Sequence, residues 1–600
     1  MSAAYKAVNW NRQKFLYDGV LAAAVLATLL AFVGVTLGLD PAATLETALI
    51  RGLGATAFAL LTVILLLGPV ARLDPRALPL LYNRRHLGVT MALLALAHAT
   101  FALVQFHALG DVNPLVSLLD GAADWRHAAT FPFELLGLGA LAILLLMAAT
   151  SHDYWLATLT APVWKALHML AYPAYALLVG HVALGSLQAA AGALPGVLLL
   201  ASALLVFGLH LVAGWRERAG DVEPAGATGW VPACRPEEIR EGRARMAVVA
   251  GERVAVFRHQ GTLSAVSNVC AHQNGPLGEG KIVDGCITCP WHGYQYRPHD
   301  GCSPPPFTET IPTFNLALRD GWVVVDPVPN PPGTPVPPLR LDLPDSAPGG
   351  GDEFYVGYFP VAPAGIARGA RLLAAAAVLL ALGSAVLVAR TQGAAAPGRF
   401  AYGTVETLRG QLREHPTPML LVPGDDGVAY RRFLLVGEGK HGAAAEVAGR
   451  DGEWVDLAGT RIARGHREML EVRAGGIARY TPPPNVRLGL PVPPPVALGR
   501  FTLRGEIVDS KCWLGVMKPA TGNVHRGCGH RCLRGGVPAF LMVGAHGDAD
   551  ALHLLLTAED GGPAPGHFAE LVGRPVELSG EVVREGDLLV MRVAQAVVAW

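Results

Sequence analysis

Long apolar runs dominate the first third of the chain. Six stretches of about twenty residues are each long enough to cross the hydrocarbon core of a bilayer as a helix. They cover residues 19–39, 52–71, 87–106, 133–150, 163–187 and 193–213. A seventh stretch follows at residues 370–389. The pattern predicts a bundle of six membrane-spanning helices and one later span.

Elsewhere the chain alternates between apolar and polar residues, which is typical of β-strands. A Pro/Gly-rich segment after the first such region is too poor in apolar residues to pack, and a second proline run divides the tail. The predicted parts are a membrane domain (1–218), a β domain (219–328), a linker (329–367), the seventh helix (368–390) and two outer lobes (391–480 and 497–600). We expect a multidomain α + β protein whose outer lobes are β-rich, with small barrels as one possible form.

Composition supports a membrane protein. Of 600 residues, 52% are hydrophobic and only 16% are charged, with a mean hydropathy of +0.36. The formal net charge is zero, which argues against a nucleic-acid partner. Eight cysteines are few for this length and argue against a disulfide-built scaffold.

The distribution of basic residues predicts the orientation, because cytoplasmic loops carry an excess of Lys and Arg. The basic positions are Lys6, Arg12, Lys14, Arg72, Arg76, Arg84, Arg85, Lys165, Arg216, Arg218, Arg368 and Arg371. The opposite loops carry Asp40, Asp111, Asp120 and Asp124. We therefore expect the N-terminus and the β domain to be cytoplasmic. The C-terminal lobes are expected outside, in the periplasm if the membrane is a bacterial inner membrane.

Two loops of the β domain each carry one cysteine and one histidine. The first is Cys270-Ala-His272, and the second is Cys289-Pro-Trp-His292. Two thiolates and two imidazoles suit a [2Fe–2S] cluster in which one iron has Cys₂ and the other has His₂. A Cys₂His₂ zinc site uses the same ligand types, but zinc fingers group the two cysteines and the two histidines separately.

This ligand pattern resembles that of the Rieske family. The resemblance extends to Gly293-Tyr294-Gln295-Tyr296 and Asp300-Gly301. High-potential members have an additional cysteine in each loop, at the places of Gly275 and Trp291 here. The resemblance therefore implies a low-potential, ferredoxin-like domain that moves single electrons. We expect the nearby Cys286 and Cys302 to be reduced structural thiols.

Histidines lie inside the predicted spans, where ionisable side chains are rare and usually functional. They are His98 and His107 in the third span, His168 and His181 in the fifth and His210 in the sixth, with His86 at the edge of the third. A lone histidine there is more often a satisfied contact between helices. A cluster of imidazoles in a bundle instead favours axial ligation of haem.

Four of these histidines fall into two pairs when their positions along the helix axes are compared. His86 and His168 lie one and three residues past the basic residues at the inner ends of the third and fifth spans. His98 and His181 lie thirteen and sixteen residues past them, which is ~18–20 Å further out at ~1.5 Å per residue. The spacing suits one or two b-type haems between the same two helices. His98, His168 and His181 are the predicted ligands, and His86 and His210 compete for the inner position.

The fifth span presents a difficulty for this pairing. A separation of thirteen residues turns a straight helix by about 220°, which directs His168 and His181 to different faces. Pro173 lies between them and can kink or bulge the helix.

The membrane domain also resembles a known family. Arg84-Arg85-His86-Leu87-Gly88 with His98, and Trp164-Lys165-Ala166-Leu167-His168 with His181, are similar to the motifs of ferric-reductase-like transmembrane domains. That family includes ferric reductases, NADPH oxidases and the haem subunit of the periplasmic methionine-sulfoxide reductase system. The resemblance covers about residues 15–215 and implies six helices, haem b and transmembrane electron transfer. The family's FAD/NADPH module has no counterpart motif after the sixth span, because no Gly-x-Gly-x-x-Gly follows a strand there.

The second outer lobe carries a dense group of metal-binding residue types. They are Cys512, His525, Cys528, His530 and Cys532. Zinc or copper is one interpretation, and one disulfide plus a free cysteine is the other. The spacing of His525 and His530 also imitates the iron site of Rieske oxygenases, but no acidic residue lies close before them and the membrane separates them from the cluster loops.

The leading hypothesis is a transmembrane electron-transfer protein of a bacterial inner membrane. A cytoplasmic ferredoxin or flavoprotein would exchange electrons with the Rieske domain, and a periplasmic redox protein would dock on the outer lobes. One alternative is a quinone-linked oxidoreductase subunit, with quinone as a partner. Another is a subunit that anchors a larger respiratory complex. Lipid surrounds the helices in each case.

Overall fold

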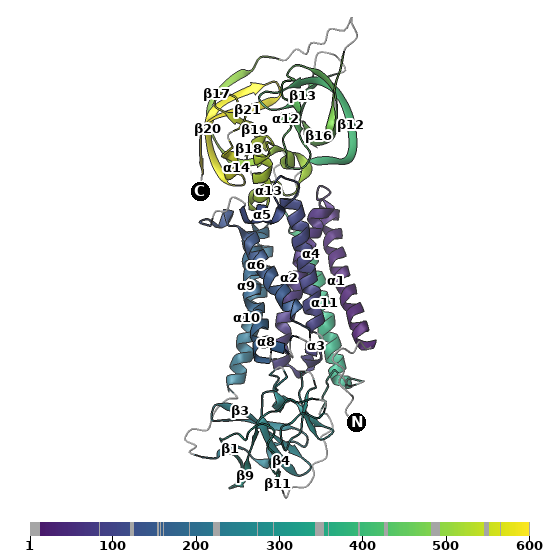
Figure 1. Ribbon diagram of the computed structural model, residues 1–600, viewed down its shortest axis with the longest axis vertical. Helices are drawn as coiled ribbons and strands as arrows, with labels where there is room; N and C mark the ends of the chain where they lie inside the picture. Colours follow the sequence, from purple (N-terminus) through teal and green to yellow (C-terminus); the bar gives the residue numbers. More distant parts are fainter. Residues whose placement is uncertain are drawn as a thin grey trace.

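The computed structural model is elongated, with three parts along its longest axis (Figure 1). Helices form the middle, small β-sheets lie at one end and two β-barrels lie at the other. The structure describes residues 12–598 apart from residues 83, 121–124, 153–154, 156–157, 160, 191, 220–228, 273, 292, 306, 342–352, 358, 360, 394–396, 425–429, 482–492, 545–550 and 565.

The middle part contains a helix at each of the seven predicted spans. These helices are α1 (Arg12–Leu39), α2 (Leu45–Leu73), α4 (Arg84–His107), α6 (Phe133–Ala149), the pair α8 (Ala161–His168) and α9 (Ala171–Leu184), α10 (Leu194–Ala219) and α11 (Ala364–Arg390). Within the described residues, six helical segments are long and apolar enough to cross a membrane. The apolar α6 is shorter, with 17 residues. Helix α11 packs against α1 through Phe32, Ala385 and Ala389.

Short helical segments connect these helices or lie in the loops of the β domain. They are η1 (Pro75–Ala77), α3 (Leu78–Tyr82), α5 (Pro114–Asp120), η2 (Ala128–Thr130), η3 (Ser186–Ala189), η4 (Pro236–Glu238) and η5 (Leu277–Glu279). The first two lie at the end of the bundle that faces the β domain, and α5 lies at the barrel end (Figure 1).

The fifth span is interrupted, as the position of Pro173 suggested. Helix α8 ends at His168, and α9 begins at Ala171. Pro173 has no N–H to bond the carbonyl of Met169, and its ring clashes with a carbonyl in that position. The segment between His168 and His181 is therefore not the single straight helix that the objection assumes.

The β domain consists of three small sheets. One has the order β1 (Val231–Cys234), β10 (Trp322–Val325), β9 (Leu316–Arg319). The second has the order β11 (Leu339–Arg340), β4 (Thr262–Ser267), β3 (Glu252–His259), β2 (Ala244–Val249), with β8 (Thr313–Phe314) also pairing with β4. The third contains β5 (Lys281–Val283), β6 (Cys286–Thr288) and β7 (Gln295–Tyr296). The third sheet and the loops beside it carry the Cys/His motifs.

The predicted linker is partly wrong. Strand β11, at Leu339–Arg340, pairs antiparallel with β4, and Leu339 and Leu341 pack against the core of the β domain. Two leucines spaced by two lie on one face of a strand, and this local alternation was hidden by the high proline content of the segment. Helix α11 also begins at Ala364, within the range assigned to the linker.

The two outer lobes are closed five-stranded barrels. The first consists of β12 (Arg399–Arg413), β13 (Met419–Pro423), β14 (Tyr430–Val436), β15 (Trp454–Arg464) and β16 (Arg467–Arg479). The second consists of β17 (Val496–Asp509), β18 (Ala539–Val543), β19 (Leu552–Ala558), β20 (Pro575–Glu585) and β21 (Leu588–Val598). The β-rich character expected from the alternating pattern is confirmed.

Both barrels have one topology. The strands are joined in the order first, second, third, fifth, fourth and back to the first, and the third and fifth are parallel. A short helix, α12 (Ala444–Val447) or α14 (Phe568–Leu571), lies between the third and fourth strands. This is the five-stranded Greek-key barrel of the OB-fold. The two lobes therefore form a structural repeat that the sequence does not show.

The second barrel has an insertion that faces the membrane bundle. A π-helical turn, η6 (Cys512–Val516), and helix α13 (Gly522–Arg534) lie between β17 and β18. Helix α13 lies between the barrel and the helix ends (Figure 1). Asn523 donates to the carbonyls of Phe131 and Leu184 at 2.9 and 3.3 Å. The insertion thus fixes the barrels to the bundle.

Candidate metal and cofactor sites

The loops of the β domain bring two buried thiols to one core. Cys270 follows β4 and Cys289 follows β6, and each is 1% exposed. The backbone N–H of Cys289 donates to the backbone carbonyl of Tyr294 at 2.8 Å, and the N–H of Cys270 donates to that of Gly275 at 3.0 Å. These tight turns hold both sulfurs in the same hydrophobic cluster. Two thiolates held in this way fit the Cys₂ half of the predicted cluster.

Aromatic residues support the cluster loops. The imidazole of His272 stacks on Tyr294 with ring centres 4.9 Å apart, and the Tyr294 hydroxyl donates to the Glu309 carboxylate. Burial and the adjacent Cys270 raise the pKa of Tyr296. Its hydroxyl therefore keeps its proton and can donate to the Cys270 sulfur 3.4 Å away. The fourth predicted ligand, His292, lies outside the described residues.

The two positions that distinguish high-potential Rieske domains lie against each other. A Cβ on Gly275 would lie 2.6 Å from the Cys289 sulfur and 3.3 Å from the Trp291 ring. Real Cβ atoms do not approach so closely, so only glycine fits here without rearrangement. Their adjacency explains how cysteines at these places can form a disulfide. The residues present here leave the site without that bond.

Trp291 also contacts the membrane bundle. Its ring packs against Leu81 and the neighbouring Ala71 and Ala77, and the Arg84 guanidinium lies 5.7 Å from its centre. Arg84 is the first residue of α4. The loop that carries Cys289 is thereby attached to the helix that carries His98.

His98 and His181 face each other between α4 and α9. Their ring centres lie 6.3 Å apart with the planes at 87°. The Nδ1 of His98 donates to the carbonyl of Ile50 at 2.8 Å, and that of His181 donates to Phe133 at 3.0 Å. These bonds leave Nε2 as the lone-pair nitrogen. Imidazole nitrogens bind metal ions at about 2 Å, so two rings on opposite sides of one ion have centres roughly 6 Å apart. The pair therefore fits two axial ligands.

Glycines make room for both imidazoles. A Cβ on Gly54 of α2 would lie 3.0 Å from the His98 ring, and one on Gly137 of α6 would lie 2.7 Å from His181. Each ring therefore lies directly on the backbone of a neighbouring helix. Sequence reasoning missed these glycines because their role depends on helix packing.

The three candidate inner ligands, His86, His168 and His210, each contact different residues. His86 Nδ1 lies 2.7 Å from Asp18, and His168 stacks on Trp164 with ring centres 3.8 Å apart. His210 bonds the Tyr172 hydroxyl through Nε2 at 2.8 Å and Val206 through Nδ1. His210 thus has the contacts of a structural polar residue. An inner pair involving His86 and His168 stays a prediction.

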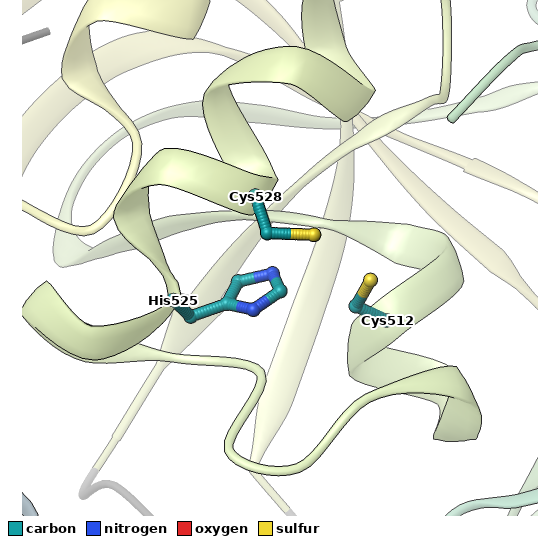
Figure 2. A group of neighbouring side chains, drawn as sticks. All are labelled: Cys512, His525 and Cys528. Atoms are coloured by element: carbon teal, nitrogen blue, oxygen red, sulfur yellow. The ribbon is translucent and has the colours of Figure 1, made fainter. Parts of the chain in front are cut away.

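The Cys/His group of the outer domain is assembled and buried. Figure 2 shows Cys528 and His525 on one helix and Cys512 on the facing turn. Cys512, His525, Cys528 and Cys532 are at most 3% exposed. Ligand atoms of Cys512, His525 and Cys528 lie within 4.8 Å of one another, as do those of Asp509, Cys512 and Cys532.

Helical geometry divides the predicted group. His525, Cys528 and Cys532 lie within about 60° of one another around α13, whereas His530 lies about 200° from Cys528 at 100° per residue. His530 accordingly contacts Glu570 at 3.1 Å, so the prediction that it joins the group is wrong. Asp509, which sequence reasoning missed, lies 2.6 Å from His525 Nε2. Its position at the end of β17 gives no local signal.

The Cys512 sulfur lies within 4.8 Å of the sulfurs of both Cys528 and Cys532. Cys528 accepts from Cys512 and Cys532, and these bonds hold the pKa of Cys528 well below its usual range. The bond to Cys528 raises the pKa of Cys512. All three cysteines are free thiols in this structure. The group therefore offers three neighbouring sulfur atoms, with the His525 imidazole beside two of them.

Two family models match the chain. The Rieske [2Fe–2S] domain matches residues 229–315, and the ferric reductase like transmembrane component matches residues 53–179. The first range contains all four predicted cluster ligands, and the second contains His86, His98 and His168.

Relatives match short parts of the chain. Cholesterol 7-desaturase of Ciona intestinalis is 33% identical over 115 residues, which are 19% of this chain and 24% of that protein. The ferredoxin subunit of anthranilate 1,2-dioxygenase from Burkholderia cepacia is 31% identical over 100 residues, 16% of this chain and 91% of that protein. The chain thus spans about a quarter of the desaturase and most of the ferredoxin subunit. Among solved structures, the Sphingomonas yanoikuyae B1 ferredoxin is 25% identical over 16% of this chain and 97% of its own, with a TM-score of 0.16.

Proposed function

Because this chain belongs to the Rieske [2Fe–2S] family and joins that domain to a ferric reductase like transmembrane component, we propose that it carries single electrons across a membrane. The coarser role, membrane electron transfer, follows from the two domains. The finer proposal is a route between the Rieske end and the outer barrels through the His98/His181 pair.

Helix α4 is the observation that carries the proposal. Its first residue, Arg84, contacts Trp291 of the second cluster loop. His98 lies fourteen residues further, roughly 21 Å along the axis. The last residue, His107, lies against α13, because a Cβ on Gly527 would be 2.9 Å from its ring. One helix thus contacts both ends of the molecule and carries His98, one imidazole of the facing pair, between them.

The residues of the Rieske domain fit a [2Fe–2S] cluster. Cys270 and Cys289 would hold one iron, and His272 and His292 the other. Such a cluster supplies one-electron chemistry. The protein contributes burial of the thiols, a donor hydroxyl on Tyr296 and a contact between the second loop and the bundle.

The facing imidazoles of His98 and His181 fit a b-type haem, which these two residues would hold. A haem held there would supply a second one-electron centre. The backbone carbonyls of Ile50 and Phe133 fix the ring orientation, and the surrounding helices exclude water. His168, with His86, is the proposed inner set if a second haem is present.

Partners follow from the two ends. We expect a ferredoxin or flavoprotein at the Rieske domain on the cytoplasmic side. A periplasmic redox protein is expected at the barrels, in a bacterial inner membrane. The chain spans only about a quarter of the desaturase, so the activity of that relative does not enter the proposal.

The decisive experiment follows electrons through proteoliposomes. Purified protein is reconstituted, a reductant is supplied to the Rieske side, and the b-type absorbance and reduction of an acceptor on the barrel side are recorded. We expect His98→Ala to lose the absorbance and at least tenfold of the transfer rate. His107→Gln, on the same helix, is the matched control and should retain both.

Two results contradict the proposal. The first is a wild-type protein without b-type absorbance. The second is transfer that persists in His98→Ala, because a route that avoids this pair would then exist. Electron paramagnetic resonance of the cluster in each variant shows whether the Rieske domain has stayed intact.

A further inference from the structure

The buried Cys/His group contains none of the residues assigned to the proposed electron route, although its helix α13 contacts His107. Figure 2 shows the sulfurs of Cys512 on η6 and Cys528 on α13 beside the His525 imidazole, whose ligand atoms lie within 4.8 Å of one another. The sulfur of Cys532, also on α13, lies within 4.8 Å of that of Cys512. Asp509 contacts the group twice, through His525 Nε2 at 2.6 Å and the N–H of Cys512 at 2.8 Å. A barrel core needs none of these polar atoms for packing.

The group is incomplete as it stands. Within the described residues, the buried Nδ1 of His525 has no hydrogen-bond partner, and an unsatisfied buried polar atom costs about 1–3 kcal/mol. The three neighbouring cysteines also leave one unpaired thiol if two of them form a disulfide. A bound cation accounts for the three sulfurs, the imidazole and the nearby carboxylate together.

We propose that Cys512, Cys528, Cys532 and His525 bind one zinc ion. Three thiolates and one imidazole form one of the four-coordinate sets of structural zinc sites. No ligand position is left for water or substrate, so the site is structural. Binding releases the protons of the thiols, and the ion changes no oxidation state. Asp509 orients the imidazole or accompanies it beside the ion.

The site would control how the barrels meet the bundle. Helix α13 supplies three of the four ligands, and it also contacts the short segments α5 and η2 that connect the membrane helices. Arg526 donates to Thr130 at 2.8 Å, and Arg531 donates to Ser117 at 3.2 Å. An ion that ties α13 to η6 would therefore fix the docking face close to Phe133, whose carbonyl holds His181.

Metal analysis of the purified full chain tests the proposal. Zinc, iron and protein are measured together in the wild type, Cys528→Ser and His530→Ala. We expect one zinc per chain in the wild type and a loss of about tenfold or more in Cys528→Ser. His530→Ala is the matched control, because His530 is on the same helix, is buried and faces Glu570; it should keep its zinc.

A second measurement covers the case in which Cys528→Ser fails to fold. Wild-type protein is grown with cobalt in place of zinc, and thiolate-to-cobalt charge-transfer absorption is recorded. Alkylation of the unreduced protein is followed by mass spectrometry. We expect the absorption, and no disulfide among the three cysteines.

The proposal is overturned by a chain without zinc, by iron in this site, or by a disulfide between two of the three cysteines. Zinc retained fully in Cys528→Ser also overturns it. None of these readouts uses electron transfer, so the site and the proposed route stand or fall separately.

Discussion

At the level of single residues, the facing imidazoles are positioned by helix backbones. His98 and His181 each donate Nδ1–H to a carbonyl near a helix end, and each lies on a glycine of the neighbouring helix. A carbonyl partner fixes the tautomer without adding a charge in the membrane interior. The pair is therefore sensitive to changes that touch neither histidine.

A substitution of Gly137 on α6 is one such change. Gly137→Ala places a methyl group 2.7 Å from His181 Nδ1, which forces the ring away from Phe133. Overpacking of this kind costs about 1–3 kcal/mol, so we expect haem retention to fall roughly tenfold or more. The haem-to-protein ratio after reconstitution with limiting haem measures the effect.

Gly139→Ala is the matched control on the same helix. Its new methyl group would lie 3.7 Å from Leu177, which is ordinary contact, and haem retention should be unchanged. Equal losses in both variants would show that α6 tolerates no added methyl group and would remove the specific role of Gly137.

Tyr296 offers a test at the cluster loops. Its hydroxyl lies 3.4 Å from the Cys270 sulfur, and hydrogen bonds to cluster sulfurs help to set the reduction potential. A hydrogen bond contributes about 1 kcal/mol, or roughly 40 mV for one electron. We expect Tyr296→Phe to lower the cluster potential by about that amount in a redox titration. Tyr294→Phe, whose hydroxyl bonds Glu309 instead, should shift it less.

At the level of elements, local signals predicted most of the architecture. Apolar length located the spans, and the Cys-x-His and Cys-x-x-His spacing located the cluster loops. Depth along two helices also anticipated that His98 and His181 lie together. Each of these features follows from residue spacing within a segment, including the comparison of depths along two helices.

Features that depend on contacts between segments were not predictable. Asp509 reaches His525 from the end of a strand, and His530 turns away because α13 starts where it does. The pairing of β11 with β4 was hidden in a proline-rich stretch. The shared barrel topology arises from pairing order, which two diverged sequences can satisfy with different residues.

The contact between the two barrels is expected to lose stability at low pH. His553 on β19 accepts from Arg467 on β16 at 2.9 Å, and burial, helped by Arg467, lowers the pKa of His553 to about 4. The fold therefore favours the neutral ring. Its stabilising contribution is complete above the unfolded value near 6.5 and is lost as the pH falls from there toward 4.

Hydrogen exchange of β16 and β19 in the full chain, corrected for intrinsic rates, measures this loss. We expect protection to fall between pH 6.5 and 4 in the wild type and to stay level in His553→Gln, which keeps an acceptor but does not titrate. His466→Gln, an exposed neighbour, should behave like the wild type. A pH-independent wild type would show that His553 does not control the junction.

At the level of the whole molecule, the opposite positions of the Rieske domain and the barrels (Figure 1) agree with the charge distribution. Single cysteines at exposed sites test the sidedness. Val328 and Tyr402 are 67% and 85% exposed. A membrane-impermeant maleimide should label Val328→Cys only in inverted vesicles and Tyr402→Cys only in right-side-out ones, above the background of the unaltered chain. Labelling of both from one side would exclude a transmembrane route.

The contact between the Rieske domain and the bundle determines whether the parts act as one protein. Arg84 lies over Trp291, and a cation–π contact of this kind contributes about 0.5–1 kcal/mol, so its loss should lower the docked population about two- to fivefold. We expect Arg84→Gln to slow haem reduction from the Rieske side by that factor, with cluster and haem contents unchanged. Arg85→Gln, one position along, should have no such effect.

Stopped-flow absorbance gives the rate of haem reduction, and the cluster and haem contents of each variant are the control. A slower rate with lost haem would assign Arg84 to haem binding, whereas an unchanged rate would mean that electrons enter the bundle elsewhere than at the Trp291 loop.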